Sequence, residues 1–297
     1  MTTNNVIAVT GASGAVGSRV AARLAAAGVR QRLIVRDNSR APTDLNAEIR
    51  QASNYGARGE MRAALEGADM LFLIPAREAP DRVRQHKTAV DAAVEAGVRH
   101  FVYLSVLGVA PRAIFTLARD HWETEEYIRA TEVPWTFLRM NLYIDFIPSM
   151  VLPDGVIRGP AGNGRLAAIL RNDIAAAAAA VLTSDGHAGH TYDLTGPQAF
   201  SLAEAADAMS RLTGKAIRYQ DETDDEAISS RATFGAPDWE IRSWVSSYQA
   251  IRNGHWQEVS QHVRELTGRD PVSLEEYLQT HPESLDHVTA SVSSARQ

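Results

Sequence analysis

Cysteine is absent from the 297-residue sequence, and lysine occurs only at Lys87 and Lys215. Without a thiol, disulfides, iron–sulfur clusters, cysteine-ligated zinc and a cysteine nucleophile are all excluded. His187 and His190 lie close together in the chain, but two histidines without a third ligand nearby do not define a metal site. Any chemistry must therefore use oxygen and nitrogen groups or a bound cofactor.

A long apolar run and a basic region are also missing. The most apolar stretch, Ile174–Leu182, is mostly alanine and covers about half of the ~20 residues that cross a bilayer. The polar start MTTNN has none of the features of a signal peptide. The net charge is −6 with both signs interspersed, so no basic stripe is available for nucleic acid. We expect a cytoplasmic protein that binds neither membranes nor nucleic acid directly.

The first half of the sequence alternates short apolar runs with helix-like segments. The apolar runs predict buried strands at Val6–Thr10, Leu33–Arg36, Met70–Ile74, Phe101–Ser105 and Trp135–Met140. Between them we expect helices at Ala15–Ala27, Glu60–Glu66, Asp81–Ala96 and Arg119–Thr131. Gln51–Tyr55 is a further candidate strand with few apolar residues. This order predicts an α/β fold, a doubly wound parallel sheet of the Rossmann type.

After residue 145 the chain becomes rich in proline and glycine, and a second part is expected. A helix at Ile174–Thr183 and a strand at His190–Leu194 could rejoin the first sheet. SLAE at Ser201–Glu204 is a capping-box sequence that predicts a helix start, and SLEE at Ser273–Glu276 repeats it. We expect a first domain at residues 1–145 and about 170–196, a smaller helix-rich lobe for substrate or a partner at 146–169 and 197–282, and a flexible tail at 283–297.

The most informative motif is Gly11-x-x-Gly14-x-x-Gly17, which joins the first strand to the first helix. One glycine permits the tight turn, one lets the backbone approach a pyrophosphate, and one lets the helix pack on the strand. The free amides at the start of the helix then face the anion. The motif predicts a dinucleotide-binding domain whose loop contacts come from Thr10, Gly11, Ser13, Gly14, Ala15, Val16 and Gly17.

The end of the second predicted strand selects the cofactor. An acidic residue there would accept from the ribose hydroxyl of NAD, whereas an arginine would pair with the 2′-phosphate of NADP. The strand LIV ends at Arg36, followed by Asp37. NADP(H) is therefore favoured, and NAD(H) stays open because of Asp37.

Segments along most of the chain resemble the NmrA-like branch of the atypical short-chain dehydrogenases. They are TGASGAVG, the strand-final VR, LFLIPA, YLSV, DHWETEEYI, RNDIAAAAAAVL and TYDLTG, and they extend the resemblance to about residue 280. The resemblance implies an NADPH-dependent quinone oxidoreductase or a redox-sensing regulator that binds NADP without turning it over.

Ordinary short-chain dehydrogenases use a tyrosine and a lysine four residues later as a proton relay. Four residues before Lys87 is Val83, and four before Lys215 is Arg211, so this pair is absent. By resemblance, His121 takes the place that holds the nicotinamide ribose, and Glu125 one turn later could orient it. The alternative is that His121 belongs to an exposed polar helix face.

Ligands of doubly wound sheets bind outside the carboxyl ends of the strands. Ser105 is therefore a second candidate catalytic contact, with a structural role as its alternative. Ile74, Pro75 and Asn141 are expected beside the cofactor. By resemblance, Tyr143 lies in the substrate pocket, and Phe146 could close it, although either could be ordinary core.

Two functions remain open from the sequence. The first is an NADPH-dependent oxidoreductase that transfers hydride to a quinone or a similar small planar electrophile, with solvent or His121 supplying the proton. The alternative is a catalytically silent NADP(H)-binding redox sensor that regulates a protein partner. A nucleotide-sugar epimerase is disfavoured because that chemistry also uses the tyrosine and lysine pair. A homodimer is compatible with either function.

Overall fold

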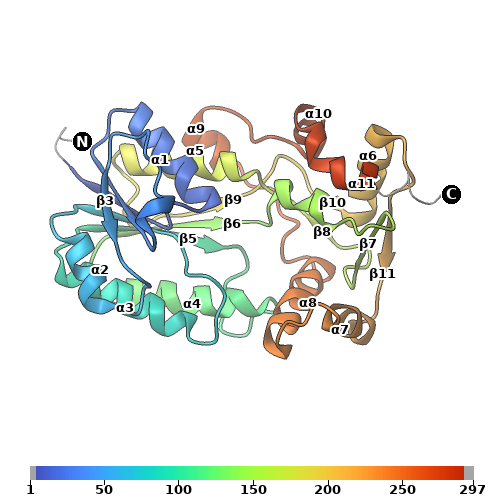
Figure 1. The fold of residues 1–297 in the computed structure, drawn as a ribbon, viewed down its shortest axis with the longest axis horizontal. Coiled ribbons are helices and arrows are strands. Elements are labelled where there is room, and N and C mark those ends of the chain that lie inside the picture. Colours follow the sequence, from blue (N-terminus) through green and yellow to red (C-terminus); the bar gives the residue numbers. More distant parts are fainter. Residues whose placement is uncertain (1–4, 291–297) are drawn as a thin grey trace.

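The computed structural model describes residues 5–290, and a seven-stranded sheet forms its larger part (Figure 1). All strands run parallel, in the order β3-β2-β1-β4-β5-β6-β9. Their bounds are β1 Ile7–Thr10, β2 Gln31–Val35, β3 Glu48–Gln51, β4 Met70–Leu73, β5 His100–Val106, β6 Trp135–Met140 and β9 Thr191–Leu194. The expected doubly wound α/β fold is therefore confirmed.

Helices cover both faces of the sheet (Figure 1). On one face lie α1 (Ala15–Ala26) and α5 (Arg171–Thr183), and on the other lie α2 (Arg58–Leu65), α3 (Arg82–Glu95) and α4 (Thr116–Arg129). In β5, Leu104 packs toward α1 and α5, whereas Tyr103 packs toward the other helices. Burial on both faces explains why the central strands are continuous apolar runs that could be recognised in the sequence.

The edge strand was predicted at the wrong residues. The structure places β3 at Glu48–Gln51, whereas the sequence indicated Gln51–Tyr55. All four residues of β3 are exposed or half-buried, so this edge strand has no apolar signature. Ala52–Tyr55 instead leads from the sheet edge toward α2.

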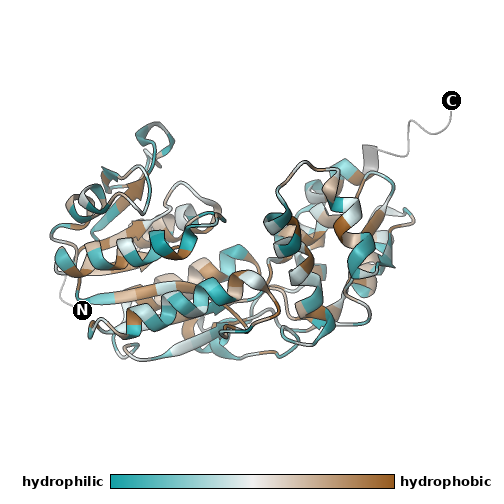
Figure 2. Cartoon of the chain, turned by 90° about the horizontal axis from the view of Figure 1, so that it is seen from below, coloured by the Kyte–Doolittle hydropathy of each residue, from teal (hydrophilic) through white to brown (hydrophobic). Residues whose placement is uncertain are grey.

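A second lobe lies beyond the carboxyl end of the sheet and has its own hydrophobic core (Figures 1 and 2). It contains η2 Ile144–Met150, β7 Val156–Gly159, β8 Arg165–Leu166, β10 Phe200–Ser201, α6 Leu202–Thr213, β11 Arg218–Asp221, α7 Asp224–Ala232, α8 Asp238–Arg252, α10 Leu274–Thr280, η3 Pro282–Leu285 and α11 Asp286–Ala290. The Ser201 capping box at the start of α6 is present with both reciprocal hydrogen bonds. We propose that this lobe and the sheet with its helices are the two expected domains.

The predicted flexible tail is wrong over its first part. Residues 282–290 form η3 and α11, and Leu285 and Val288 are buried in the core of the second lobe. Apolar side chains three residues apart give this segment a helical face to bury. Residues 291–297 lie outside the described residues.

The chain passes between the two parts five times within residues 5–290. The crossings follow β6, β8, β9, α8 and α9 (His262–Thr267), the last of which packs on α5. Backbone hydrogen bonds join the crossing segments: Ile169 N–H donates to the Leu142 carbonyl, Ala167 N–H to that of Trp256, and Gly196 N–H to that of Ala167. Between residues 5 and 290 there is no helix with the length and apolar character needed to span a bilayer.

Candidate active site

The glycine loop forms a tight turn directly above the first helix. Gly11 adopts a positive φ of 58°, and Gly14 N–H donates to the Gly11 carbonyl at 2.8 Å. A Cβ on Gly17 would lie 2.3 Å from the Gly11 carbonyl oxygen, so only glycine fits there. No side chain caps α1, and no acidic residue lies in its first turn. The first amides of the helix are thus available to an anion.

A cavity of about 460 Å³, the loop cavity, lies over this turn. The predicted loop residues Gly11, Ser13 and Gly14 line it, as do the predicted Arg36, Ile74 and Pro75. The other predicted loop residues lie elsewhere: Ala15 is exposed, Val16 is core, and Gly17 packs under the turn.

Thr10 acts beneath the loop rather than in the cavity. Its hydroxyl is buried, donates to the Phe72 carbonyl at 3.2 Å and accepts from Ile74 N–H at 2.9 Å. These bonds fix the end of β4 against the end of β1. Thr10 therefore positions Ile74, which does line the cavity.

Two arginines line the loop cavity near the end of β2, and the neighbouring Asp37 carboxylate does not line it. Arg36 and Arg40 line it, with Arg40 in the 3₁₀ turn η1 (Asn38–Arg40). The Asp37 carboxylate caps this turn, accepting from Ser39 N–H at 2.9 Å and from the Ser39 hydroxyl at 2.7 Å. These hydrogen bonds hold the pKa of Asp37 below its ordinary value. Arg40 was not predicted from the sequence because its place at the cavity depends on that turn.

A second cavity of about 470 Å³, the interlobe cavity, continues from the first. Pro75, Ala76, Arg77 and Glu78 line both, so the loop between β4 and α3 is their common wall. Most of the remaining lining is apolar or aromatic, with Val106, Phe115, Leu117, Met140, Leu142, Trp244 and Trp256. The two adjoining cavities, which extend from the glycine loop to the second lobe, are together called the cleft.

His121 lines the interlobe cavity but is only 3% exposed, so its predicted alternative as an exposed-face residue is wrong. Arg82 donates to its Nε2 at 3.1 Å, and its Nδ1 lies 2.8 Å from the Tyr103 hydroxyl. A guanidinium can only donate, so Nε2 must be unprotonated and the proton sits on Nδ1. Burial, reinforced by the Arg82 charge, lowers the pKa of His121 well below its ordinary value. His121 is therefore a neutral acceptor.

Arg82, which the sequence did not single out, is the buried cation of this cavity. It is 4% exposed; Nε donates to the Ala76 carbonyl at 3.0 Å, and Nη1 pairs with Asp120 at 3.2 Å. Together with His121, these partners use three of about five guanidinium N–H groups. A positive charge at the first position of a helix interacts unfavourably with the helix dipole. This unusual placement of Arg82 was the one feature of the sequence that could have indicated a functional role.

Glu78 is a second group that the sequence did not reveal. It lines both cavities, and its Oε2 is buried without a hydrogen-bond partner among residues 5–290. Burial is the main cause that raises the pKa of Glu78, opposed by the nearby Arg82 charge. A carboxyl whose pKa is raised holds its proton to a higher pH than an ordinary glutamate and can act as a proton donor.

Ser105 does not reach either cavity. It is fully buried, and its hydroxyl donates to Glu125 at 2.6 Å. Glu125 is also fully buried and pairs with Arg129 and Arg139, so it does not orient His121 as expected. Ser105 and Glu125 belong to an ion-pair cluster between β5, β6 and α4.

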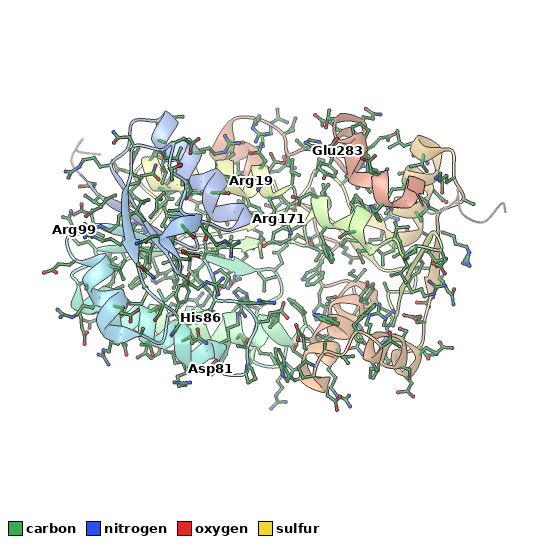
Figure 3. All side chains as sticks on the ribbon, viewed as in Figure 1. Arg19, Asp81, His86, Arg99, Arg171 and Glu283 are labelled. Atoms are coloured by element: carbon green, nitrogen blue, oxygen red, sulfur yellow. The ribbon has the colours of Figure 1, made fainter. Side chains whose placement is uncertain are left out.

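Asn141, expected beside the cofactor, and Tyr143, expected in the substrate pocket, both line the interlobe cavity, whereas Phe146 does not. The Asn141 amide donates to the Trp256 carbonyl at 2.9 Å and ties the end of β6 to the second lobe. Arg171, at the start of α5 near the middle of the molecule (Figure 3), lies 3.9 Å above the Tyr143 ring. Burial raises the pKa of Tyr143 to about 12, so its phenol stays protonated.

The chain matches the model of the NmrA-like family over residues 3–278. It is 34% identical over 285 residues to the (4-alkanoyl-5-oxo-2,5-dihydrofuran-3-yl)methyl phosphate reductase of Streptomyces griseus, covering 94% of this chain and 99% of that protein. It is 30% identical over 285 residues to the NAD(P)H azoreductase of Xenophilus azovorans, covering 93% and 98%. The NADPH complex of an Escherichia coli NADPH-dependent quinone oxidoreductase matches with a TM-score of 0.85 and 31% identity, covering 92% and 99%. The chain belongs to the NmrA-like family.

Proposed function

We propose that this protein is an NADPH-dependent oxidoreductase that transfers hydride to a quinone or a similar small planar electrophile. The observation that carries the proposal is that the loop cavity and the interlobe cavity adjoin. This arrangement places an uncapped glycine-loop helix and two arginines next to an aromatic cavity that contains a buried guanidinium. The three proteins compared above, each at least 30% identical to this chain, are named as a phosphate-ester reductase, an azoreductase and a quinone oxidoreductase.

NADPH fits the donor groups of the loop cavity. The backbone at Gly11, Ser13 and Gly14 would hold the pyrophosphate, and Arg36 with Arg40 would hold the 2′-phosphate. Asp37 is bound to Ser39 and does not line the cavity, which disfavours NAD(H). The nicotinamide would then follow the wall at Pro75 toward Asn141.

The chemistry of the chain itself follows from the groups in the interlobe cavity. When bound, NADPH supplies the hydride. Trp244, Trp256 and Phe115 offer flat apolar surface to a planar acceptor. The two remaining N–H groups of Arg82 stabilise the negative charge that develops on the acceptor oxygen. Glu78 exchanges the proton with solvent, and His121 positions Arg82.

A fluorescence titration with NADPH and NADH, followed in the same cuvette by a simple benzoquinone, tests the proposal. We expect tighter binding of NADPH than of NADH and a rapid quinone-dependent loss of the NADPH signal. Tight NADPH binding without oxidation by any of a panel of quinones would contradict the enzyme and favour the redox sensor. The next experiment would then compare partner binding with NADPH, with NADP and without nucleotide.

A further inference from the structure

A third cavity, the side cavity, lies within the second lobe and is not needed for the hydride transfer proposed above. Its volume is about 330 Å³, at the lower end of the range for ligand sites. It lies between η2, α7 and α8, and its walls are mainly Leu142, Met150, Leu152, Trp244, Tyr248 and Ile251.

The side cavity adjoins the interlobe cavity. Leu142 and Trp244 line both, so one aliphatic and one aromatic side chain form their shared wall. A molecule whose reactive head lies beside Arg82 and Tyr143 would therefore reach the side cavity by passing these two side chains. Leu142 and Trp244 are the only residues that the two linings share.

The rim of the side cavity exposes large apolar side chains to solvent. Phe146 is 44% exposed and Phe234 is 63% exposed, and both line the cavity. Phe234 lies edge-on to Trp244 with ring centroids 6.4 Å apart. Exposed aromatic side chains gathered at one opening mark a ligand or interaction site.

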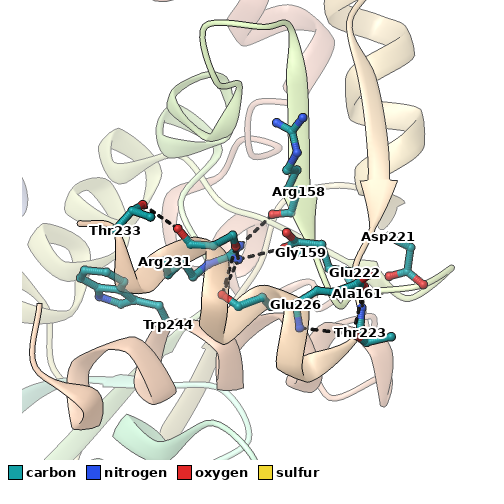
Figure 4. A network of polar contacts seen from close by, with 12 residues as sticks. Arg158, Gly159, Ala161, Asp221, Glu222, Thr223, Glu226, Arg231, Thr233 and Trp244 are labelled. Atoms are coloured by element: carbon teal, nitrogen blue, oxygen red, sulfur yellow. Dashed lines mark hydrogen bonds and ion pairs between the residues drawn. The ribbon is translucent and has the colours of Figure 1, made fainter. Parts of the chain in front are cut away.

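The polar end of the side cavity carries no unpaired charge. Arg231 pairs with Glu222 at 2.9 Å and donates to the Arg158 carbonyl at 2.8 Å (Figure 4). The Arg158 guanidinium itself pairs with Asp154. Both cations are thus matched by carboxylates, and the cavity favours a neutral, apolar ligand over an anion.

We propose that the side cavity is a second subsite, which binds the neutral hydrophobic tail of an acceptor whose reducible head lies in the interlobe cavity. This inference rests on the proposed function and narrows its substrate class to two-part molecules, a planar electrophile with an alkyl or aryl substituent. Such a tail adds binding without changing the chemistry at the head, because it lies away from Arg82 and the nicotinamide.

The test is a series of benzoquinones with the same head and n-alkyl tails from methyl to decyl. Each methylene group that leaves water gives about fourfold tighter binding, so KM should fall steeply with tail length and then level off once the cavity is full. A ratio of kcat/KM for the decyl and methyl compounds that stays near one would overturn the proposal.

Two variants locate the tail. Ser247 lines the side cavity only, so Ser247→Phe fills it and should remove the gain from tail length. Phe234→Ser changes a rim residue that is 63% exposed, and it should reduce the gain. Leu212→Ser removes another exposed apolar side chain, on α6 and outside the linings of both cavities, and is the control. Equal tail-length ratios in all four proteins would contradict the subsite.

A binding measurement separates this inference from the proposed function. A redox-inert 4-alkylphenol, added without NADPH, should quench Trp244 fluorescence increasingly as its tail lengthens, and Trp244→Phe should abolish that signal. If quinones are not reduced but alkylphenols bind with this dependence, the subsite stands and the hydride transfer fails. If quinones are reduced and alkylphenols show no dependence on the tail, only the subsite fails.

Discussion

Arg82 and His121 form a pair in which the arginine is charged and the histidine is neutral: Nη2 of Arg82 donates to Nε2 of His121 at 3.1 Å. The direction of this bond cannot be reversed, since guanidinium has no acceptor. Burial lowers the pKa of His121, and the Arg82 charge adds to this effect because protonation would place two cations in contact. In the function we propose, Arg82 therefore faces the acceptor, and His121 holds Arg82 in position.

The neutral state of His121 gives a pH-dependent stability. In the unfolded chain a histidine has a pKa near 6.5, but in the folded protein the pKa of His121 is much lower. Below about pH 6.5 the unfolded state binds a proton that the folded state does not. As the pH is lowered through this range, the free energy of unfolding therefore decreases by up to about 1.4 kcal/mol per pH unit. His121→Gln keeps one acceptor and one donor without titrating, and urea unfolding between pH 7 and 5 should show a shallower dependence.

His190→Gln, at an exposed position, is the control and should leave the pH dependence unchanged. If His121 were instead the proton donor, His121→Gln would lower turnover at pH 7 by roughly 10²-fold or more. Identical unfolding profiles for His121→Gln and the unchanged protein would refute the neutral buried histidine.

Arg82→Gln should lower kcat with quinones by about 10²-fold, the usual effect of losing one donor that stabilises a developing negative charge. NADPH affinity should change little, because Arg82 does not line the loop cavity. The variant leaves Asp120 without its partner, so the double variant Arg82→Gln/Asp120→Asn should recover stability but not turnover. Full activity in the folded double variant would exclude Arg82 from the chemistry.

Glu78→Gln should remove an ionisation from the pH profile of kcat/KM. The carboxyl donates a proton only while protonated, and burial raises its pKa, so activity should decline as the pH rises through that value. The variant should lack this decline and be slower at low pH. Asp81→Asn, at the start of α3 and outside both cavities, serves as the control. A profile unaltered by Glu78→Gln would show that solvent alone supplies the proton.

Ser105→Ala distinguishes a structural from a catalytic serine. Loss of the 2.6 Å bond to buried Glu125 should cost about 1–3 kcal/mol of unfolding free energy, since a charged acceptor loses a partner. Turnover with NADPH and quinone should stay within a factor of about two, as for a substitution remote from the reacting atoms. A large loss of kcat without loss of stability would restore Ser105 to the active site.

Arg36→Glu should weaken NADPH far more than NADH, by roughly 10²-fold, because it replaces a phosphate partner with a like charge. Arg40→Glu should act in the same direction, since both residues line the loop cavity. Arg218→Glu, on an exposed strand of the second lobe, controls for net charge. Unchanged discrimination between the two nucleotides in both variants would assign the 2′-phosphate elsewhere.

The sheet could be predicted because its strands are buried on both faces. Trp135–Met140 was found at its observed bounds, and Met70–Ile74 to within one residue. The edge strand Glu48–Gln51 was not found, because nothing apolar in EIRQ distinguishes it from a loop. The helix at Asp286–Ala290 was missed because only its contact with the second lobe makes it a helix.

In the site, residues fixed by backbone conformation were predictable and residues fixed by packing were not. The glycines can be recognised in the sequence because the fold requires glycine at both positions: Gly11 has a positive φ, and Gly17 has no room for a side chain. Arg82 and Glu78 enter the cleft through the packing of α3 on α4 and the course of the preceding loop, which no local pattern encodes. Ser105 was predicted in the site because it lies near the carboxyl end of a strand, but its side chain points to the α4 face of the sheet, toward Glu125.

The hydrogen-bonded crossings between the two lobes bear on how a ligand enters and leaves. Many two-lobed enzymes shield their reaction by rotating one lobe about a hinge of one or two segments. Here several crossing segments of the chain are hydrogen-bonded to one another near Leu142, Ala167 and Gly196. A rotation of one lobe would require the backbone torsion angles of all these segments to change together. A Cβ on Gly196 would even meet the Ala168 carbonyl at 2.1 Å. We therefore expect ligands to exchange through rotamer changes of side chains such as Trp244, and the small-angle X-ray scattering profile should be the same with and without NADPH.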